Sequence, residues 1–216
     1  MFPEVIETDR LRLERFDAAV DPTTFYAVAG AGQSDTVVAE TEYVTWSPHA
    51  HLKESADVIE QFRDGWTDHE TATYAVIPRE GEEGAGTLAG NTGLGIEWNH
   101  RRGLPGIWLR KPFWGRRYSG ERAGALAALA FERLDLEVLA VDVLVGNEQS
   151  QRAVDRYIDR LGGRRTGRLR NQVTTADDTV HDVIRWSVTR EEYREAAPNQ
   201  EPTFQETLDE SRLTTE

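Results

Sequence analysis

The chain has 216 residues, a length that favours one globular domain. Its 38 acidic and 25 basic residues give a formal net charge of −13, which argues against generic binding to nucleic acid because the phosphates would be repelled. The absence of cysteine excludes disulfides, thiolate nucleophiles and cysteine-ligated zinc. No apolar run approaches the ~20 residues of a membrane span and no leader pattern is present, so we expect a cytoplasmic protein that does not bind membranes.

The basic residues are distributed unevenly. Lysine occurs only at Lys53 and Lys111, and arginine supplies the other 23 basic residues. A strongly acidic chain with little lysine suggests a halophile-like protein that stays soluble at high internal salt. Two segments, 110–122 and 160–170, concentrate arginine and are candidate anion sites, although ordinary pairing on helix and strand surfaces would also use some arginine.

Strand and helix patterns alternate in the first half of the chain. Leu11 and Leu13 point to one side of an expected strand, with polar residues between and beside them. Residues 30–51 are rich in turn formers and give no clear pattern. The elements expected up to Lys111 are strands over 8–16, 71–78, 87–98 and 106–111 and helices over 22–29 and 52–66.

The second half predicts the order helix, strand, helix, followed by a hairpin. Residues 138–145 are almost wholly apolar, as in a strand covered on both faces. Asn147 can cap the next helix, and Gly162 with Gly163 ends it. The expected elements are helices over 120–134 and 147–161, strands over 138–145, 164–174 and 180–188, and an acidic, mobile tail or loosely attached helix over 197–216. This order predicts a mixed α/β domain over 1–196 with one parallel crossover near 107–145.

Several common kinds of site are excluded. Neither lysine follows a glycine, so there is no P-loop, and no Gly-x-Ser-x-Gly elbow is present. The glycines between 84 and 95 lack the dinucleotide-binding spacing, and the histidines lack that of a helical zinc motif, so we expect no metal. The turn between Lys111 and a helix near Gly120 remains, where Gly115 permits unusual backbone angles. Free amides at the helix start, with arginines around them, predict a phosphate or pyrophosphate site.

Several motifs then occur in an order that points to a family. Residues 107–123, with the sequence IWLRKPFWGRRYSGERA, resemble the acyl-CoA-binding motif of the GNAT superfamily of N-acetyltransferases. Residues 147–152 and 161–163 resemble the start and the end of that family's next helix, while 7–13 and 183–188 resemble its first and last strands. The resemblance covers nearly the whole predicted domain and is greatest to the branch that acetylates the N-terminal alanine or serine of ribosomal proteins.

The resemblance implies a single GNAT-like domain whose central mixed sheet of six to seven strands is flanked by helices, with acetyl-CoA as co-substrate. The backbone of Leu109 and Arg110 would pair with the pantetheine arm, and the amides of residues 114–119 would hold the pyrophosphate. Asn147 and Ser150 would line the thiol end. The residues implied in cofactor binding are Leu109, Arg110, Lys111, Trp114, Gly115, Arg116, Arg117, Tyr118, Ser119, Gly120, Asn147 and Ser150.

This chain departs from the family pattern at positions that matter for chemistry. Arg117 stands where the family usually has glycine, so an added Cβ faces the phosphate site and its charge would partly compensate. Val154 stands where many members place a proton-donating tyrosine, and Tyr157 follows one turn later. Ser150 could protonate the departing thiolate, whereas Tyr157 is either a second candidate or a core residue.

No motif assigns the catalytic base. Glu97, at a strand edge, and Asp142, in an otherwise apolar strand, are the candidates, because a carboxylate among apolar groups has a raised pKa and accepts an amine proton. The alternatives are a solvated edge residue for Glu97 and a structural hydrogen-bond acceptor for Asp142. Tryptophans that could line an acceptor pocket, or simply pack in the core, are Trp46, Trp66 and Trp98.

We therefore predict an acyl-CoA-dependent N-acetyltransferase that moves an acetyl group from acetyl-CoA directly to a primary amine, either a protein N-terminus or a small molecule. Ser150, Tyr157 and Glu97 are its expected catalytic residues, and an amide near Leu109 would stabilise the developing oxyanion. No covalent intermediate with the enzyme is needed, which suits a chain without cysteine. We expect a monomer or homodimer. The alternative is a non-catalytic CoA-binding or regulatory module with the same fold.

Overall fold

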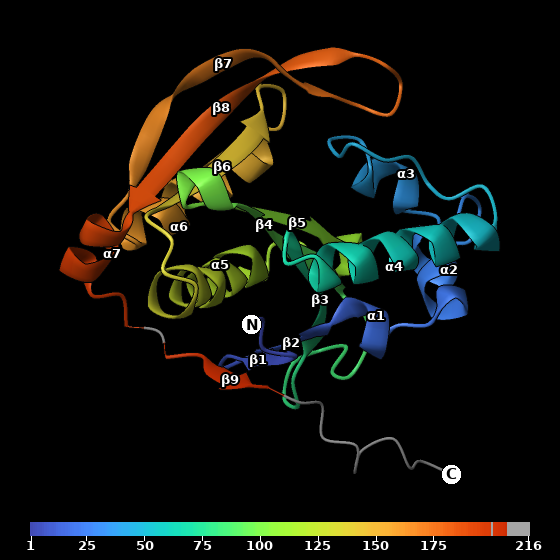
Figure 1. The fold of residues 1–216 in the computed structure, drawn as a ribbon. Coiled ribbons are helices and arrows are strands. Elements are labelled where there is room, and N and C mark those ends of the chain that lie inside the picture. Colours follow the sequence, from blue (N-terminus) through green and yellow to red (C-terminus); the bar gives the residue numbers. More distant parts are fainter. Residues whose placement is uncertain (200, 207–216) are drawn as a thin grey trace.

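The computed structural model describes residues 1–199 and 201–206, which form one sheet of nine strands flanked by helices on both faces (Figure 1). The sheet order is β7-β8-β6-β5-β4-β3-β2-β1-β9. The strands are β1 (Val5–Glu7), β2 (Leu11–Arg15), β3 (Thr71–Pro78), β4 (Gly90–Glu97), β5 (Arg102–Leu109), β6 (Val138–Leu144), β7 (Arg164–Thr174), β8 (Val180–Thr189) and β9 (Thr203–Gln205). The predicted mixed α/β class is confirmed, and the short strands β1 and β9 at one end of the sheet account for the strands beyond six to seven.

The helices separate into two layers. They are α1 (Phe16–Ala19), α2 (Pro22–Ala29), α3 (Val37–Glu40), α4 (Leu52–Thr67), α5 (Tyr118–Ala128, continued by a π turn over Leu129–Arg133), α6 (Glu148–Arg160) and α7 (Arg190–Ala196). Apolar side chains of α1, α2 and α4 pack together against β3 and β5 in one cluster. Those of α5 and α6 belong to a second, larger cluster. The predicted helices over 22–29, 52–66 and 147–161 are confirmed within one or two residues.

The centre of the sheet contains the predicted parallel crossover. Strands β5 and β6 pair in parallel at Arg102 with Val138 and at Gly103 with Leu139, and then diverge. Pro105, two residues further along β5, carries no N–H, so the ladder between the two strands cannot continue regularly there. Beyond this point β5 stays paired with β4, and β6 stays paired with β8. A gap between two paired halves of one sheet results.

The helices beside the gap have capping residues at the ends that the sequence predicts. The Asn147 side chain accepts a hydrogen bond from the Ser150 amide at 3.0 Å, which is the predicted cap of α6. Gly162 has a φ of +83° after the last turn of that helix, as a glycine stop should. Helix α5 begins at Tyr118, two residues earlier than expected, and Arg117 before it adopts a left-handed φ of 65°.

The expectation of a mobile tail or loosely attached helix over 197–216 is wrong for residues 203–205, which form a strand. Strand β9 pairs antiparallel with β1, where Phe204 lies opposite Ile6. The Arg133 guanidinium stacks on the Phe204 ring at 5.0 Å from its centroid. Residue 200 and residues 207–216 lie outside the described part of the chain. In the described part, no helix is long and apolar enough to cross a membrane.

Candidate active site

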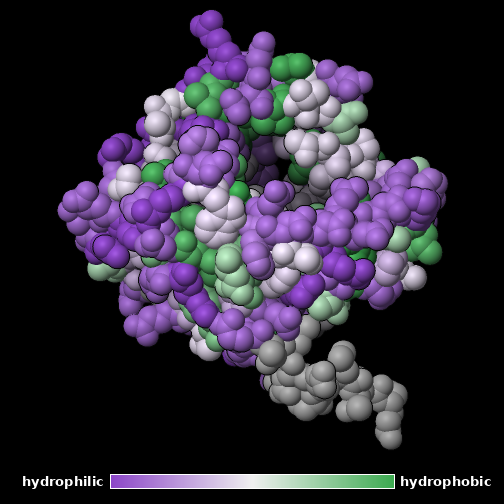
Figure 2. Space-filling view, viewed as in Figure 1, coloured by the Kyte–Doolittle hydropathy of each residue, from purple (hydrophilic) through white to green (hydrophobic). Residues whose placement is uncertain are grey.

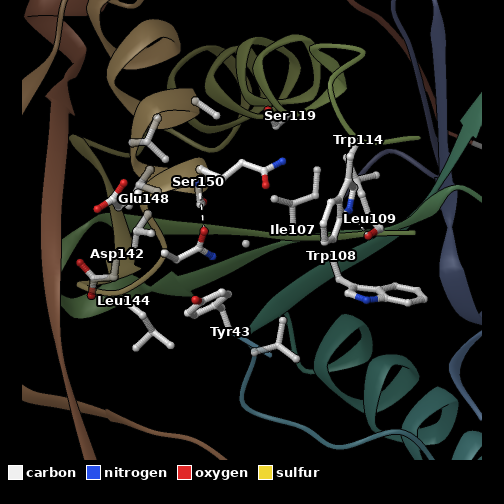
Figure 3. A pocket seen from close by; sticks show the side chains of 18 of the residues that line it. Tyr43, Ile107, Trp108, Leu109, Trp114, Ser119, Asp142, Leu144, Glu148 and Ser150 are labelled. Atoms are coloured by element: carbon white, nitrogen blue, oxygen red, sulfur yellow. Dashed lines mark hydrogen bonds between the residues drawn. The ribbon is translucent and has the colours of Figure 1, made fainter. Parts of the chain in front are cut away.

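A cavity of about 670 Å³ occupies the gap between β5 and β6. Residues of β5, β6, α5 and α6 line it, together with the segment from α3 to Thr45. Figure 2 shows this face of the molecule hollowed below the β7–β8 hairpin. In Figure 3, Ser119 lies on the α5 side and Tyr43 on the opposite side, with Ile107 and Leu109 of β5 between them. The cavity therefore has two walls: a helical wall formed by α5 and α6, and a loop wall formed by residues 39–45.

Strand β5 offers unpaired backbone groups to the cavity. The Arg110 amide donates to the Ala89 carbonyl at 2.9 Å, on the β4 side. Because neighbouring residues of a strand point their amides in opposite directions, the N–H groups of Leu109 and Ile107 face the gap. The Leu109 carbonyl also faces it and accepts a hydrogen bond from the Trp114 indole at 2.7 Å. The Leu109 N–H thus faces the cavity, whereas the Arg110 amide is used by β4 and cannot pair with a pantetheine arm; the Ile107 N–H faces the gap instead.

The turn before α5 separates into cavity-facing and outward-facing residues. Trp114, Gly115, Arg117 and Ser119 line the cavity. Gly115 has a φ of +77° and an added Cβ would meet nothing within 4 Å, so its role is conformational. The remaining implied residues of the turn make contacts within the protein. The side chains of Arg110, Arg116 and Tyr118 donate hydrogen bonds to the Leu88 carbonyl, Glu83 and Glu82, respectively. The Lys111 amide donates to Glu40, and Gly120 packs near Tyr157.

Helix α6 presents a mixed stripe to the cavity. Asn147 and Ser150, which were expected at the thiol end, line it together with Val154 and Tyr157. The Tyr157 side chain is 2% exposed, and its hydroxyl finds no hydrogen-bond partner among the described residues. Burial raises the pKa of the Tyr157 phenol, so the hydroxyl keeps its proton.

The carboxylates expected as bases are occupied elsewhere. Glu97 lies where β5 and β6 are joined and binds Arg102 at 2.5 Å, so its assignment to the site is wrong. Asp142 lines the cavity, but Arg185 holds both of its oxygens at 2.7 and 2.6 Å, which supports the structural alternative. Trp46 packs on the cavity-lining Trp108 with ring centroids 5.3 Å apart. Trp66 is a core residue, and the Trp98 indole donates to the His69 carbonyl outside the site.

The sequence did not reveal Glu40, a carboxylate at the end of α3 that lines the cavity. The side chain is 6% exposed, and Oε1 accepts hydrogen bonds from the Lys111 amide and the Thr36 hydroxyl, both at 2.6 Å. Oε2 is buried and has no partner within residues 1–199 and 201–206. A four-residue helix in a turn-rich segment has no periodicity from which this position could have been found.

Arg122 is the second residue that the sequence did not single out. It lies in the second turn of α5, is 1% exposed and lines the cavity. Its guanidinium lies 5.7 Å from the centroid of the Tyr157 ring. Neither Nε nor Nη1 has a hydrogen-bond partner in the described part of the chain. Burial lowers the pKa of this guanidinium, although an arginine remains charged in proteins.

The two walls differ in charge. The helical wall brings Arg117 and Arg122 to the cavity, together with the amides at the start of α5. The loop wall brings Glu40 and Glu42. A polyanion is favoured along the first wall and a cation along the second. No cluster of three potential metal ligands occurs in the residues that the structure describes.

Comparison with known proteins agrees with this architecture. The family model of the acetyltransferase (GNAT) domain matches residues 10–157. A search of curated proteins finds no match. The structure of a proposed acetyltransferase from T. thermophilus is 25% identical with a TM-score of 0.70, and the match covers 91% of this chain and 94% of that one.

Two further solved structures share the fold. A proposed ribosomal-protein-serine acetyltransferase from Vibrio cholerae is 23% identical with a TM-score of 0.68, covering 88% of this chain and 99% of that one. The microcin C7 self-immunity acetyltransferase MccE, solved with acetyl-CoA and AMP, is 14% identical with a TM-score of 0.69, covering 84% of this chain and 93% of that one. The family match spans well over half of the chain and includes the diverging strands β5 and β6, the turn before α5 and most of α6. This protein therefore belongs to the GNAT acetyltransferase family and is an acyl-CoA-dependent N-acyltransferase.

Proposed function

We propose that this protein transfers an acetyl group from acetyl-CoA to a cationic primary amine, either a protein N-terminus or a small molecule. The observation that carries the proposal is one cavity whose two walls have opposite charge, with Arg117 and Arg122 on one side and Glu40 and Glu42 on the other. A polyanionic donor and a cationic acceptor can thus approach each other from opposite walls across the gap in the sheet.

The residues of the helical wall fit acetyl-CoA, which supplies the activated acyl group when it is bound. The free N–H groups of Ile107 and Leu109 can extend the sheet by pairing with an amide-containing arm. Amides from residues 114–119 and the start of α5 can hold phosphate oxygens, and Arg117 adds charge beside them. Whichever of these two N–H groups the arm does not use can hold the charge that develops on the acyl oxygen.

We assign the acceptor side to Glu40 in place of Glu97. The Lys111 amide and the Thr36 hydroxyl fix Oε1, which leaves Oε2 to meet an ammonium group and to take its proton. This arrangement lets the amine act directly, and it needs no nucleophilic residue of the chain. Tyr157 keeps its proton on the other wall and remains the candidate donor toward the leaving group.

A specific observation also favours the alternative, a CoA-binding module without catalysis. Arg117 occupies a left-handed conformation that suits glycine, and its side chain reaches the cavity at the turn. Calorimetric titration with acetyl-CoA, followed by a thiol-release assay over a panel of peptides and small amines, separates the two functions. Binding with release for at least one amine is the expected result. Binding without release for any amine would support the module, and no binding would overturn both.

A further inference from the structure

Among the described residues, the buried Arg122 guanidinium pairs with no acidic side chain and interacts with the neutral Tyr157 phenol. Arg122 is almost completely buried, yet two of its nitrogens, Nε and Nη1, find no acceptor in residues 1–199 and 201–206. A buried charge is costly to leave without hydrogen bonds, and native structures rarely do so unless a ligand completes the site. The guanidinium therefore points to an anionic or strongly accepting group that enters from the cavity.

Within residues 1–199 and 201–206, no acidic side chain of the cavity supplies that group. The acidic residues that line the cavity are Glu40, Glu42, Asp142 and Glu148. The first two belong to the opposite wall, Asp142 is held by Arg185, and Glu148 contacts Arg152 at 3.3 Å. Arg117 and Arg156 line the cavity on the same wall and add positive charge there.

The position of Arg122 indicates which part of a bound cofactor it meets. Arg117 lies at the N-terminal end of α5, beside the phosphate-holding amides, whereas Arg122 lies roughly 7 Å further along the helix axis. Its side chain stacks toward Tyr157, on the α6 stripe that also carries Ser150 and Val154. This is the stripe expected at the thiol end of the cofactor, away from the turn.

We propose that the Arg122 guanidinium holds the thiolate of CoA as acetyl transfer releases it; the proposal rests on the function proposed above. In the step, the amine nitrogen bonds to the acyl carbon, the carbon–sulfur bond breaks, and the sulfur keeps the electron pair. Glu40 has already taken the ammonium proton, and the second proton that the nitrogen loses on forming the amide passes to water. Arg122 stays protonated and donates hydrogen bonds to the sulfur, which takes a proton from Tyr157 or from water as CoA leaves. Val154 leaves room for a long side chain and offers no competing donor.

The test compares two ligands that differ in the sulfur atom alone, CoA and desulfo-CoA, without an acceptor. The wild-type protein should prefer CoA, and the preference should grow as the pH rises toward thiol pKa values near 8.5. We expect Arg122→Met to remove a preference on the order of tenfold at high pH while desulfo-CoA affinity changes little. Arg122→Lys, which keeps the charge, should retain part of the preference, and Arg117→Met should weaken both ligands equally.

A second measurement needs no variant. Difference absorbance of the bound thiolate in the ultraviolet should show that the pKa of the CoA thiol falls on binding to the wild-type protein. An unchanged thiol pKa would overturn the proposal, as would an equal loss of CoA and desulfo-CoA affinity in Arg122→Met, which would place the guanidinium on a pantetheine carbonyl or a phosphate. If desulfo-CoA fails to bind the wild-type protein, the proposed function itself is wrong.

Discussion

The two walls of the cavity are built from different kinds of structure. The helical wall consists of α5 and α6, regular helices of 11 and 13 residues that pack into the main core, so its charges sit on rigid supports. The loop wall consists of a four-residue helix and the turns after it, and Glu40 is held by two hydrogen bonds. Rigid helices suit the acyl donor, which is the same for every acceptor. The sequence of a wall built from short segments can vary to suit different amine acceptors while the fold stays the same.

The largest difference between the walls should appear in catalysis. Glu40→Gln keeps the size of the side chain and its bond from the Lys111 amide, but removes the proton acceptor. We expect kcat to fall on the order of 10²- to 10⁴-fold while acetyl-CoA affinity stays within about twofold, because a general base contributes that much. Steady-state kinetics and calorimetry on the same preparations check this. Glu42→Gln is the matched control on the same wall, and an equal loss of kcat in both variants would contradict the assignment.

A smaller effect on the helical wall concerns Arg117. Arg117→Gly relieves a left-handed φ of 65°, so the free energy of unfolding should rise by about 1 kcal/mol at most. The same change removes a charge near the phosphate site, and acetyl-CoA affinity should fall on the order of tenfold at low salt and less at high salt. Arg117→Ala, which keeps the Cβ, should lose the affinity without gaining stability. Tighter binding by the glycine variant at both salts would identify Arg117 as an obstruction and favour the non-catalytic module.

A modest effect is expected far from both walls. A chain ending at Asn199 lacks β9, which exposes the edge of β1 and removes the Phe204 contact with Arg133. We expect a loss of about 1 kcal/mol, or roughly 2–4 °C in melting temperature, with acetyl-CoA affinity unchanged. A chain ending at Glu206 keeps β9 and serves as the control. Equal melting temperatures for the two truncated chains would show that β9 adds nothing to stability.

The smallest effect should be a pH dependence behind the loop wall. His49 is buried against Phe25 and Trp46, its Nδ1 lies 2.7 Å from the Ser55 hydroxyl, and burial lowers the pKa of the imidazole. The unfolded chain therefore binds a proton below about pH 6.5 that the native state resists, so stability falls as the pH falls, by at most about 1.4 kcal/mol per unit. Urea unfolding at pH 7.5 and 5.5 should show a smaller loss for His49→Gln than for the wild type. The same loss in both would assign the dependence to other groups.

Regular periodicity explains what could be predicted. The apolar stripes of α4 and α6, the apolar run of β6 and the cap at Asn147 placed the fold and most of the helical wall within a residue or two. The direction of the Arg110 amide depends on the register between β4 and β5, which one strand cannot reveal.

Chemical role was harder to predict than position. Glu97 is a carboxylate, as a base requires. Arg102, which follows the turn after Glu97, forms an ion pair with it and neutralises its charge. Glu40 is recognisable only when tertiary contacts bury it and leave one oxygen without a partner in the described chain. Arg122 was one arginine among several in the candidate anion site over 110–122. Nothing local distinguishes it from the others, because its burial depends on a tyrosine from α6.

The divergence of β5 from β6 after Gly103 has a consequence for the cohesion of the whole molecule. The sheet consists of two half-sheets, which pair only at Arg102 with Val138 and at Gly103 with Leu139 among the described residues. Together, helices α5 and α6 pack across both halves. A ligand that hydrogen-bonds to Ile107 and contacts α6 would replace the hydrogen bonds that are missing between the two half-sheets. Ligand binding and unfolding are then linked equilibria, so the melting temperature rises with the amount of ligand bound.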